Sequence, residues 1–200
     1  MTVRAVVFDI GGVLEINDDS AFPDPWCQRH GIAVERLDAA LDSIPGDAVV
    51  GQVTMEQVLD HLGERLSLTE VQAIEWERDY WRWYVGILDR PLFEWFAGLR
   101  GRGLKVGILS NSGPGAREQE AVWGFEDVTD VLIYSHEVGL RKPDRAVYDL
   151  TAAKLSVEPE EIVFLDDKQL CVDGARAAGW QAVLHVDTQT SIAELEALLG

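Results

Sequence analysis

Apolar runs alternate with helical repeats along most of the chain, and this alternation predicts an α/β fold. The first run, residues 3–8, is rich in β-branched side chains and predicts a strand buried on both faces of a sheet. Strands separated by helical crossovers indicate a parallel sheet covered by helices on both sides. Four more runs predict strands at 105–110, 131–135, 162–166 and 181–186, separated by helices at 91–102, 114–123, 143–155 and 170–178 and followed by a helix from residue 191.

The segment 15–87 shows no strand pattern and predicts a helical insert. Residues 15–24 are polar, which is typical of an exposed loop or hinge, and apolar residues then recur at helical spacing. Thr54 with Gln57 forms a capping-box pattern. Because the insert leaves the first strand at its carboxyl end, it is placed to act as a lid. We therefore expect residues 1–14 and 88–200 to form a Rossmann-like core and residues 15–87 to form a helical cap.

Aromatic residues gather near the end of this insert. Trp76, Tyr80 and Trp83 recur at helical spacing. Such a stripe is typical of packing inside the insert or at a self-association surface, and the alternative is a surface that stacks on a ligand. Trp81 falls on another face of the same helix and is expected to be exposed.

Composition narrows the class of protein. The chain has 200 residues, of which 47% are apolar and 26% charged, as in folded soluble proteins. Its net charge of -18 argues against a nucleic-acid or anionic-membrane partner. Only two cysteines occur, no secretory pattern begins the chain, and no uncharged stretch reaches the ~18 apolar residues of a membrane span. We therefore expect a cytoplasmic protein with reduced thiols.

Each of the first four core strands, or the loop after it, supplies a polar group at one end. Each group alone has a structural explanation, as a helix cap or a turn residue. Because the carboxyl ends of parallel strands meet at one edge of a sheet, we expect the groups to lie close together. They are Asp9 with Gly11 and Gly12, Ser110 with Asn111, Lys142, and Asp166 with Asp167.

The chemistry of this set fits phosphoryl transfer. Several carboxylates with a backbone carbonyl form an oxygen site suited to Mg²⁺. Asp9 can attack phosphorus to give an aspartyl-phosphate that water then hydrolyses. Lys142 and Mg²⁺ would offset the negative charge, while Ser110 would bond phosphoryl oxygens. We also expect Lys142 to lower the pKa of Asp9 and keep it ionised.

With these residues in place, the chain resembles the haloacid dehalogenase superfamily of hydrolases over essentially its full length. The resemblance implies that Asp9 is the nucleophile of a phosphatase for a small phosphorylated metabolite. It implies that Ser110, Asn111, Lys142 and Gly12 contact the substrate, and that Asp9, Asp166, Asp167 and the Gly11 carbonyl hold Mg²⁺. The turn at 51–54 is similar to one in the cap of the subgroup that includes the phosphatase domain of soluble epoxide hydrolase. The four motifs are Phe-Asp-Ile-Gly-Gly-Val at 8–13, Ile-Leu-Ser-Asn at 108–111, Gly-Leu-Arg-Lys-Pro-Asp at 139–144 and Phe-Leu-Asp-Asp at 164–167.

One position departs from the family pattern. The usual first motif has a second aspartate, the general acid and base, where this chain has Gly11. Three interpretations follow: a slow phosphatase, a phosphatase that recruits an acid from Glu15, Asp18 or Asp19, or a phosphate-binding protein with little turnover. A metal-independent 2-haloacid dehalogenase is a further alternative, against which the retained acidic pair argues. The sequence names neither the substrate nor the choice between monomer and homodimer.

Overall fold

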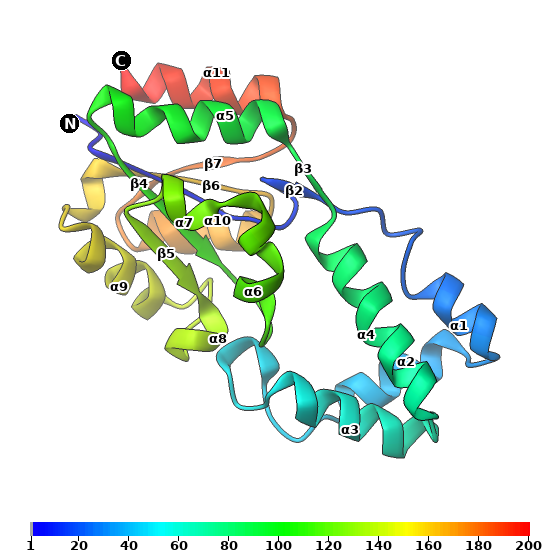
Figure 1. The fold of residues 1–200 in the computed structure, drawn as a ribbon. Helices are drawn as coiled ribbons and strands as arrows, with labels where there is room; N and C mark the ends of the chain where they lie inside the picture. The colour runs from blue at the N-terminus through cyan, green and yellow to red at the C-terminus, as the bar shows by residue number, and fades with distance from the viewer. Residues whose placement is uncertain (1) are drawn as a thin grey trace.

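The computed structural model describes residues 2–200 and has a five-stranded sheet at its centre, in the order β5-β4-β1-β6-β7 (Figure 1). All of its neighbouring strands run parallel. The apolar runs therefore predicted the α/β class and the parallel sheet correctly. The strands are β1 (Ala5–Phe8), β4 (Lys105–Ser110), β5 (Val131–Tyr134), β6 (Ile162–Asp166) and β7 (Gln181–Leu184).

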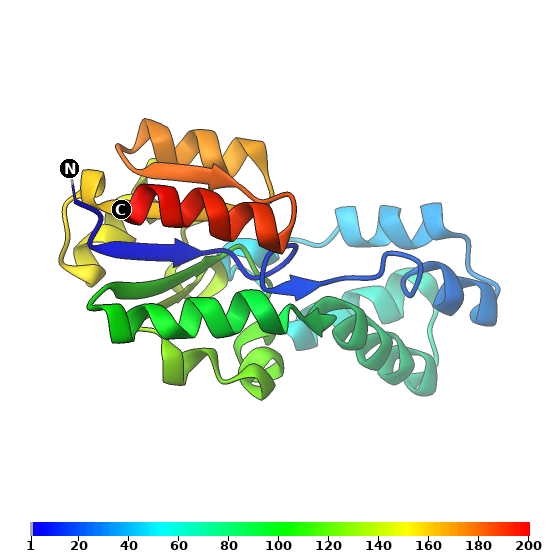
Figure 2. The same cartoon turned by 90° about the horizontal axis from the view of Figure 1, so that it is seen from above.

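Helices cover both faces of this sheet, as Figure 2 shows from above. Successive side chains of a strand point to opposite faces, so Phe8 and Val7 belong to different cores. Phe8 packs with residues of α5 (Arg90–Gly98) and α11 (Thr188–Leu199), and Val7 with residues of α9 (Arg145–Leu155) and α10 (Gln169–Ala177). The remaining core elements are short: η2 (Leu99–Arg102), α6 (Ala116–Glu120), η3 (Ala121–Trp123), α7 (Phe125–Val128), α8 (Ser135–Val138) and η4 (Pro159–Glu161).

The segment between β1 and α5 forms a helical insert beside the carboxyl end of the sheet (Figure 1). Both of its long helices begin at capping boxes, in which Thr54 and Thr69 accept hydrogen bonds from backbone amides. The insert has its own apolar core, in which Trp26, Leu37 and Leu62 are fully buried. No helix within residues 2–200 is both long and apolar enough to cross a membrane. The elements of the insert are α1 (Asp24–His30), α2 (Val34–Asp42), η1 (Ala48–Val50), α3 (Met55–Leu66) and α4 (Glu70–Val85).

A small antiparallel ribbon joins the insert to the core. It pairs β2 (Glu15–Ile16) with β3 (Ile87–Leu88), so the chain enters and leaves the insert through adjacent strands. Glu15 was expected in an exposed loop, and this expectation is wrong. Glu15 lies in β2 and its side chain is fully buried.

A second contact holds the insert against the core at α8. Ser135 Oγ donates a hydrogen bond to the carbonyl of Val49 over 2.6 Å. Gly51 adopts a φ of 72° and packs so closely that an added Cβ would lie 2.0 Å from the carbonyl oxygen of His136. Only glycine fits this contact, which is the physical reason for a glycine in the 51–54 turn.

The aromatic helix α4 touches both parts of the molecule. Trp76 and Tyr80 stack with centroids 5.1 Å apart and pack in the insert. Trp81, expected to be exposed, is buried among core residues and lies where an added Cβ on Gly115 would touch it. The prediction failed because α4 packs on α6 as well as on the insert.

Candidate active site

Three neighbouring strands bring their polar ends to one edge of the sheet. Asp9 follows the central strand β1, Ser110 ends β4 on one side, and Asp166 ends β6 on the other. The Asp9 amide donates to the carbonyl of Leu165 over 2.9 Å, which extends the pairing of β1 with β6 to the reactive position. All three polar side chains are buried. The expected meeting at the carboxyl edge therefore occurs.

Lys142 reaches this edge from the loop after α8 and lies between two carboxylates. Its Nζ is 2.8 Å from Asp9 Oδ1 and 2.7 Å from Asp166 Oδ2. Burial lowers the pKa of Lys142, but the charges of Asp9 and Asp166 outweigh burial and raise the pKa above its ordinary value. The ammonium group therefore stays charged, and its two ion pairs offset the cost of burying the charges.

The acid–base state of Asp9 differs from the sequence-based prediction. Burial raises the pKa of Asp9 to about 7, and repulsion from Asp166 acts in the same direction. Lys142 does lower the pKa as expected, but its effect is smaller than that of desolvation. The prediction of a net lowering of the Asp9 pKa was wrong because it did not include the burial of the carboxylate.

The side chain of Asn111 holds the main chain of Lys142 in place. Its Nδ2 donates to the carbonyl of Lys142 over 2.9 Å, and its Oδ1 accepts from the amide of Lys142 over 2.8 Å. The side-chain amide is thus bonded at both ends to one residue of the lysine loop. Asn111 also lines the cavity over the site, and its predicted contact with phosphate stays a prediction.

Gly12 is also bonded inside the protein. Its N–H donates to the carbonyl of Glu15 over 2.8 Å. Gly12 lines the cavity over the site, and its predicted contact with substrate stays a prediction. With a φ of 77°, Gly12 lies where an added Cβ would approach Asp167 Oδ2 to 2.5 Å. Glycine at this position therefore allows the side chain of Asp167 to lie against the loop that follows β1.

Three carboxylates form a candidate site for a divalent cation. Asp9, Asp166 and Asp167 each offer an oxygen within 4.8 Å of the others. Asp167 Oδ1 is buried and accepts no hydrogen bond from any residue in 2–200, and such an atom calls for a missing partner. The oxygens of Asp166, by contrast, accept from Lys142 and from the amide of Lys168. Asp167 is therefore the carboxylate with most capacity left for direct coordination.

A cavity of about 840 Å³ opens over these groups. Its floor includes Asp9, Ser110 and Lys142, and its walls include Trp83 and Tyr84 from the insert. These two aromatic residues were not predicted as site residues, although their position on the aromatic helix was a signal. His185, which was not predicted as a site residue, also lines the cavity. It follows β7, so the strand-end rule applied to the last strand would have found it.

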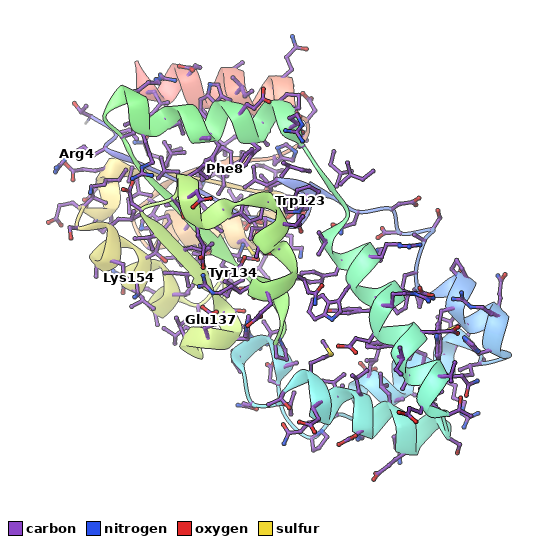
Figure 3. All side chains as sticks on the ribbon, viewed as in Figure 1. Arg4, Phe8, Trp123, Tyr134, Glu137 and Lys154 are labelled. Atoms are coloured by element: carbon purple, nitrogen blue, oxygen red, sulfur yellow. The ribbon has the colours of Figure 1, made fainter. Side chains whose placement is uncertain are left out.

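The space that a side chain at Gly11 would occupy is open. Within residues 2–200, no atom beyond the chain neighbours of Gly11 lies within 4 Å of where its Cβ would be. Among the proposed substitutes, Asp18 is exposed and accepts hydrogen bonds from Ser20, whereas Asp19 and Glu15 line the cavity. Glu15 accepts from Trp123 Nε1 over 2.7 Å, and burial raises its pKa to about 10. Trp123 is labelled in Figure 3.

Glu15 has a second buried carboxyl group as its neighbour. Glu120, on α6, accepts a hydrogen bond from the Tyr134 hydroxyl over 2.6 Å. Burial raises the pKa of Glu120 to about 7, although the bond from Tyr134 lowers it. The charge on Glu120 in turn raises the pKa of Glu15. The two carboxyl groups therefore resist being ionised together.

We expect Glu120→Gln to change how stability depends on pH. A carboxyl group whose pKa is raised on folding keeps a proton that the unfolded chain releases, so stability falls as pH rises from the ordinary carboxyl value to about 7. The substitution should flatten this fall and, at pH 8, raise the free energy of unfolding by about 1–3 kcal/mol. Urea unfolding between pH 5 and pH 8 measures it. Glu118→Gln, exposed on the same helix, is the matched control, and equal slopes in the two variants would contradict the burial argument.

The fold and its edge define a class of protein: a Rossmann-like enzyme with a buried aspartate, a lysine and an acidic pair around one cavity. Residues 3–179 match the family described as haloacid dehalogenase-like hydrolase. The chain therefore belongs to this family and is a hydrolase, as the four motifs predicted.

Known proteins similar to this chain include phosphatases. It is 33% identical over 193 residues to phosphatase MT3486 of Mycobacterium tuberculosis, covering 92% of this chain and 88% of that protein. It is 26% identical to bifunctional epoxide hydrolase 2 of Sus scrofa. That match covers the whole of this chain but only 39% of the epoxide hydrolase. This second similarity agrees with the predicted subgroup.

A solved structure confirms the fold. The family enzyme bt-2542 of Bacteroides thetaiotaomicron, in complex with magnesium and inorganic phosphate, superposes with a TM-score of 0.77 at 18% identity. The match covers 92% of this chain and 94% of that one. At this identity the likeness concerns the arrangement of helices and strands.

Proposed function

We propose that the protein is a magnesium-dependent phosphatase that hydrolyses phosphomonoesters through an aspartyl-phosphate on Asp9. The observation that carries the proposal is the buried Asp167 Oδ1, which has no hydrogen-bond partner in the described part of the chain and lies with Asp9 and Lys142 in one cavity. The similarity to a phosphatase and the magnesium and phosphate bound by bt-2542 support it.

Asp9 has one oxygen engaged and one available. Oδ1 accepts hydrogen bonds from the Ile10 amide and from Lys142, each over 2.8 Å. These donors fix the carboxylate and leave Oδ2 to attack phosphorus in line with the leaving oxygen. Ser110, at the end of the neighbouring strand, supplies a hydroxyl to a phosphoryl oxygen. The charge of Lys142 offsets the charge that gathers there.

The residues at the edge fit Mg²⁺ because they present hard oxygen ligands. Asp9, Asp167 and the Gly11 carbonyl would hold the ion directly, with Asp166 joining directly or through water. Bound there, Mg²⁺ would neutralise charge on the phosphoryl group.

Protonation of the leaving oxygen is the step for which the family's usual group is missing. Of the three interpretations, we propose a slow phosphatase whose acid comes from another part of the cavity wall. Glu15 is our candidate, because it lines the cavity and its Oε2 is buried without a partner among residues 2–200. A phosphate-binding protein with little turnover is the outcome if no such group acts.

The fold does not separate a phosphatase from a dehalogenase, since a 2-haloacid dehalogenase from Pseudomonas syringae also shares it. The acidic pair favours the phosphatase. A dehalogenase that works without metal has no need for Asp167, whose Oδ1 has no hydrogen-bond partner among residues 2–200 and lies beside a second carboxylate. A cation satisfies both groups at once.

Removal of divalent metal tests this function. We expect hydrolysis of p-nitrophenyl phosphate and of a panel of phosphorylated metabolites to fall at least about 100-fold in EDTA and to recover on addition of Mg²⁺. The same EDTA-treated protein should release no chloride from 2-chloropropionate. Chloride release without metal, or phosphatase activity indifferent to EDTA, would overturn the assignment.

A further inference from the structure

An apolar chamber adjoins the catalytic cavity. It has a volume of about 440 Å³ and is lined by insert residues that include Phe22, Leu41 and Tyr80. Trp83 and Tyr84 line both this chamber and the catalytic cavity. The only charged side chain in the lining is the exposed Asp38, and the volume is in the usual range for ligand pockets.

The chamber is not simply the interior of the insert. Deep in the insert and away from the chamber, Trp26 and Leu62 are fully buried. By contrast, three apolar side chains that line the chamber are only half-buried: Leu41, Met55 and Trp83. Apolar surface gathered around one hollow favours an apolar occupant over water.

The wall between chamber and catalytic cavity is held in place. Asn17 lines the catalytic cavity, and its Nδ2 donates to the carbonyl of Trp83 over 2.7 Å and to that of Tyr84 over 2.8 Å. These bonds satisfy the last carbonyls of α4 and fix the two aromatic residues at the junction. A molecule bound across the junction would meet charged groups on one side and aromatic and aliphatic groups on the other.

We propose that the substrate is a phosphomonoester with a hydrocarbon tail, its phosphate at Asp9 and its tail past Trp83 and Tyr84 in the chamber. This inference rests on the proposed phosphatase function and names its substrate class. A sugar phosphate, polar along its whole length, would leave the apolar walls in contact with water. An alkyl chain removes them from water and gains free energy with each methylene group.

An alkyl phosphate series tests the proposal in the magnesium-loaded protein. From ethyl through butyl and octyl to dodecyl phosphate, all below their micelle concentrations, kcat/KM should rise by up to about fourfold per methylene until the chamber is full. A flat series with measurable hydrolysis would overturn the tail site and leave the phosphatase standing.

Binding separates failure of the tail site from failure of the proposed reaction. Octyl phosphonate, which is not hydrolysed, should bind at least about tenfold more tightly than ethyl phosphonate and with a more negative heat-capacity change. If no ester is hydrolysed but this difference is present, the phosphatase reading fails and the tail site stands. Equal affinities overturn the tail site whatever the activity.

A substitution that fills the chamber should separate long from short alkyl phosphates. Leu41→Trp, on α2, should lower kcat/KM for dodecyl phosphate at least about tenfold and leave ethyl phosphate within about twofold. Ala39→Trp introduces the same ring on the exposed side of α2 and should change neither. If Leu41→Trp disturbs folding, Leu41→Asn keeps the branched shape and the number of side-chain heavy atoms but makes the group polar, with the same expected selectivity. An equal loss for both esters, or no loss for either, would overturn the proposal.

Discussion

Asp9→Asn is expected to lower phosphatase activity by about 10⁴-fold or more, because the amide cannot form the phosphorylated intermediate. The substitution changes one oxygen to nitrogen and little else. The Ile10 amide can still donate to the oxygen of the side chain, in place of its 2.8 Å bond to Asp9 Oδ1. The loss should therefore appear in kcat, with the affinity for phosphate retained.

Folding should survive this change. Burial raises the pKa of Asp9, which means that its negative charge is costly in the folded protein. The neutral amide removes that cost, and Lys142 keeps its ion pair with Asp166 at 2.7 Å. The free energy of unfolding, measured in urea at neutral pH, should therefore stay within about 1–2 kcal/mol of the parent.

Two measurements make the result specific to the nucleophile. Asp60→Asn makes the same chemical change at an exposed position on α3 and should leave activity unchanged. The parent, quenched during turnover, should carry a hydroxylamine-sensitive phosphoryl group on the peptide that contains Asp9, and the Asn variant should carry none. Equal rates for Asp9→Asn and the parent would remove Asp9 from the mechanism.

The core of the fold and the meeting of its strand ends could be predicted because both follow from local patterns. Each buried strand is a run of four to six residues with its own apolar signature. Once the strands are parallel, the edge that holds Asp9 also receives Ser110 and Asp166. No long-range information was needed for this step.

The ribbon and the buried acids could not be predicted because they depend on distant partners. A strand of two residues has no period, so the pairing of Glu15 with Leu88 leaves no trace in the sequence. Glu15 is buried only in the folded protein, where it accepts a hydrogen bond from Trp123, a residue that follows the insert in the sequence. The sequence shows only an acid in a polar stretch, for which exposure is the ordinary expectation.

The roles of backbone groups were equally out of reach. Asn111 was correctly brought to the site, but its two bonds to the main chain of Lys142 depend on how the lysine loop folds back. Helical spacing likewise separated Trp81 from Trp83 but did not say which face meets the core. Spacing gives the relative directions of side chains, and packing decides what lies opposite them.

Gly11 is the position at which this chain departs from its family, and its surroundings make the departure reversible by substitution. It lines the catalytic cavity, and the space around its missing side chain is open among the described residues. Its φ lies outside the left-handed region, unlike the 77° of Gly12, so an aspartate meets no backbone strain there. A new carboxyl group at Gly11 would enter the cavity beside Asp9.

Unless Glu15 already protonates the leaving oxygen efficiently, Gly11→Asp should raise kcat by about 10²–10⁴-fold on alkyl phosphates, the usual gain from a positioned general acid and base. The gain should be much smaller on p-nitrophenyl phosphate, whose leaving oxygen needs no proton. Steady-state rates on both esters measure this difference. Gly12→Asp is the matched control, because the same side chain one residue later would collide with Asp167 and should reduce activity.

The size of the gain also decides whether Glu15 already does this work. If it does, Gly11→Asp alone should add little, Glu15→Gln should lower the rate on alkyl phosphates, and the double variant should recover it, because the new aspartate replaces the lost acid. If Glu15 is only structural, Glu15→Gln should leave the ratio of alkyl to p-nitrophenyl rates unchanged. A carboxyl group that protonates the leaving oxygen must alter that ratio, since only the alkyl ester depends on the proton.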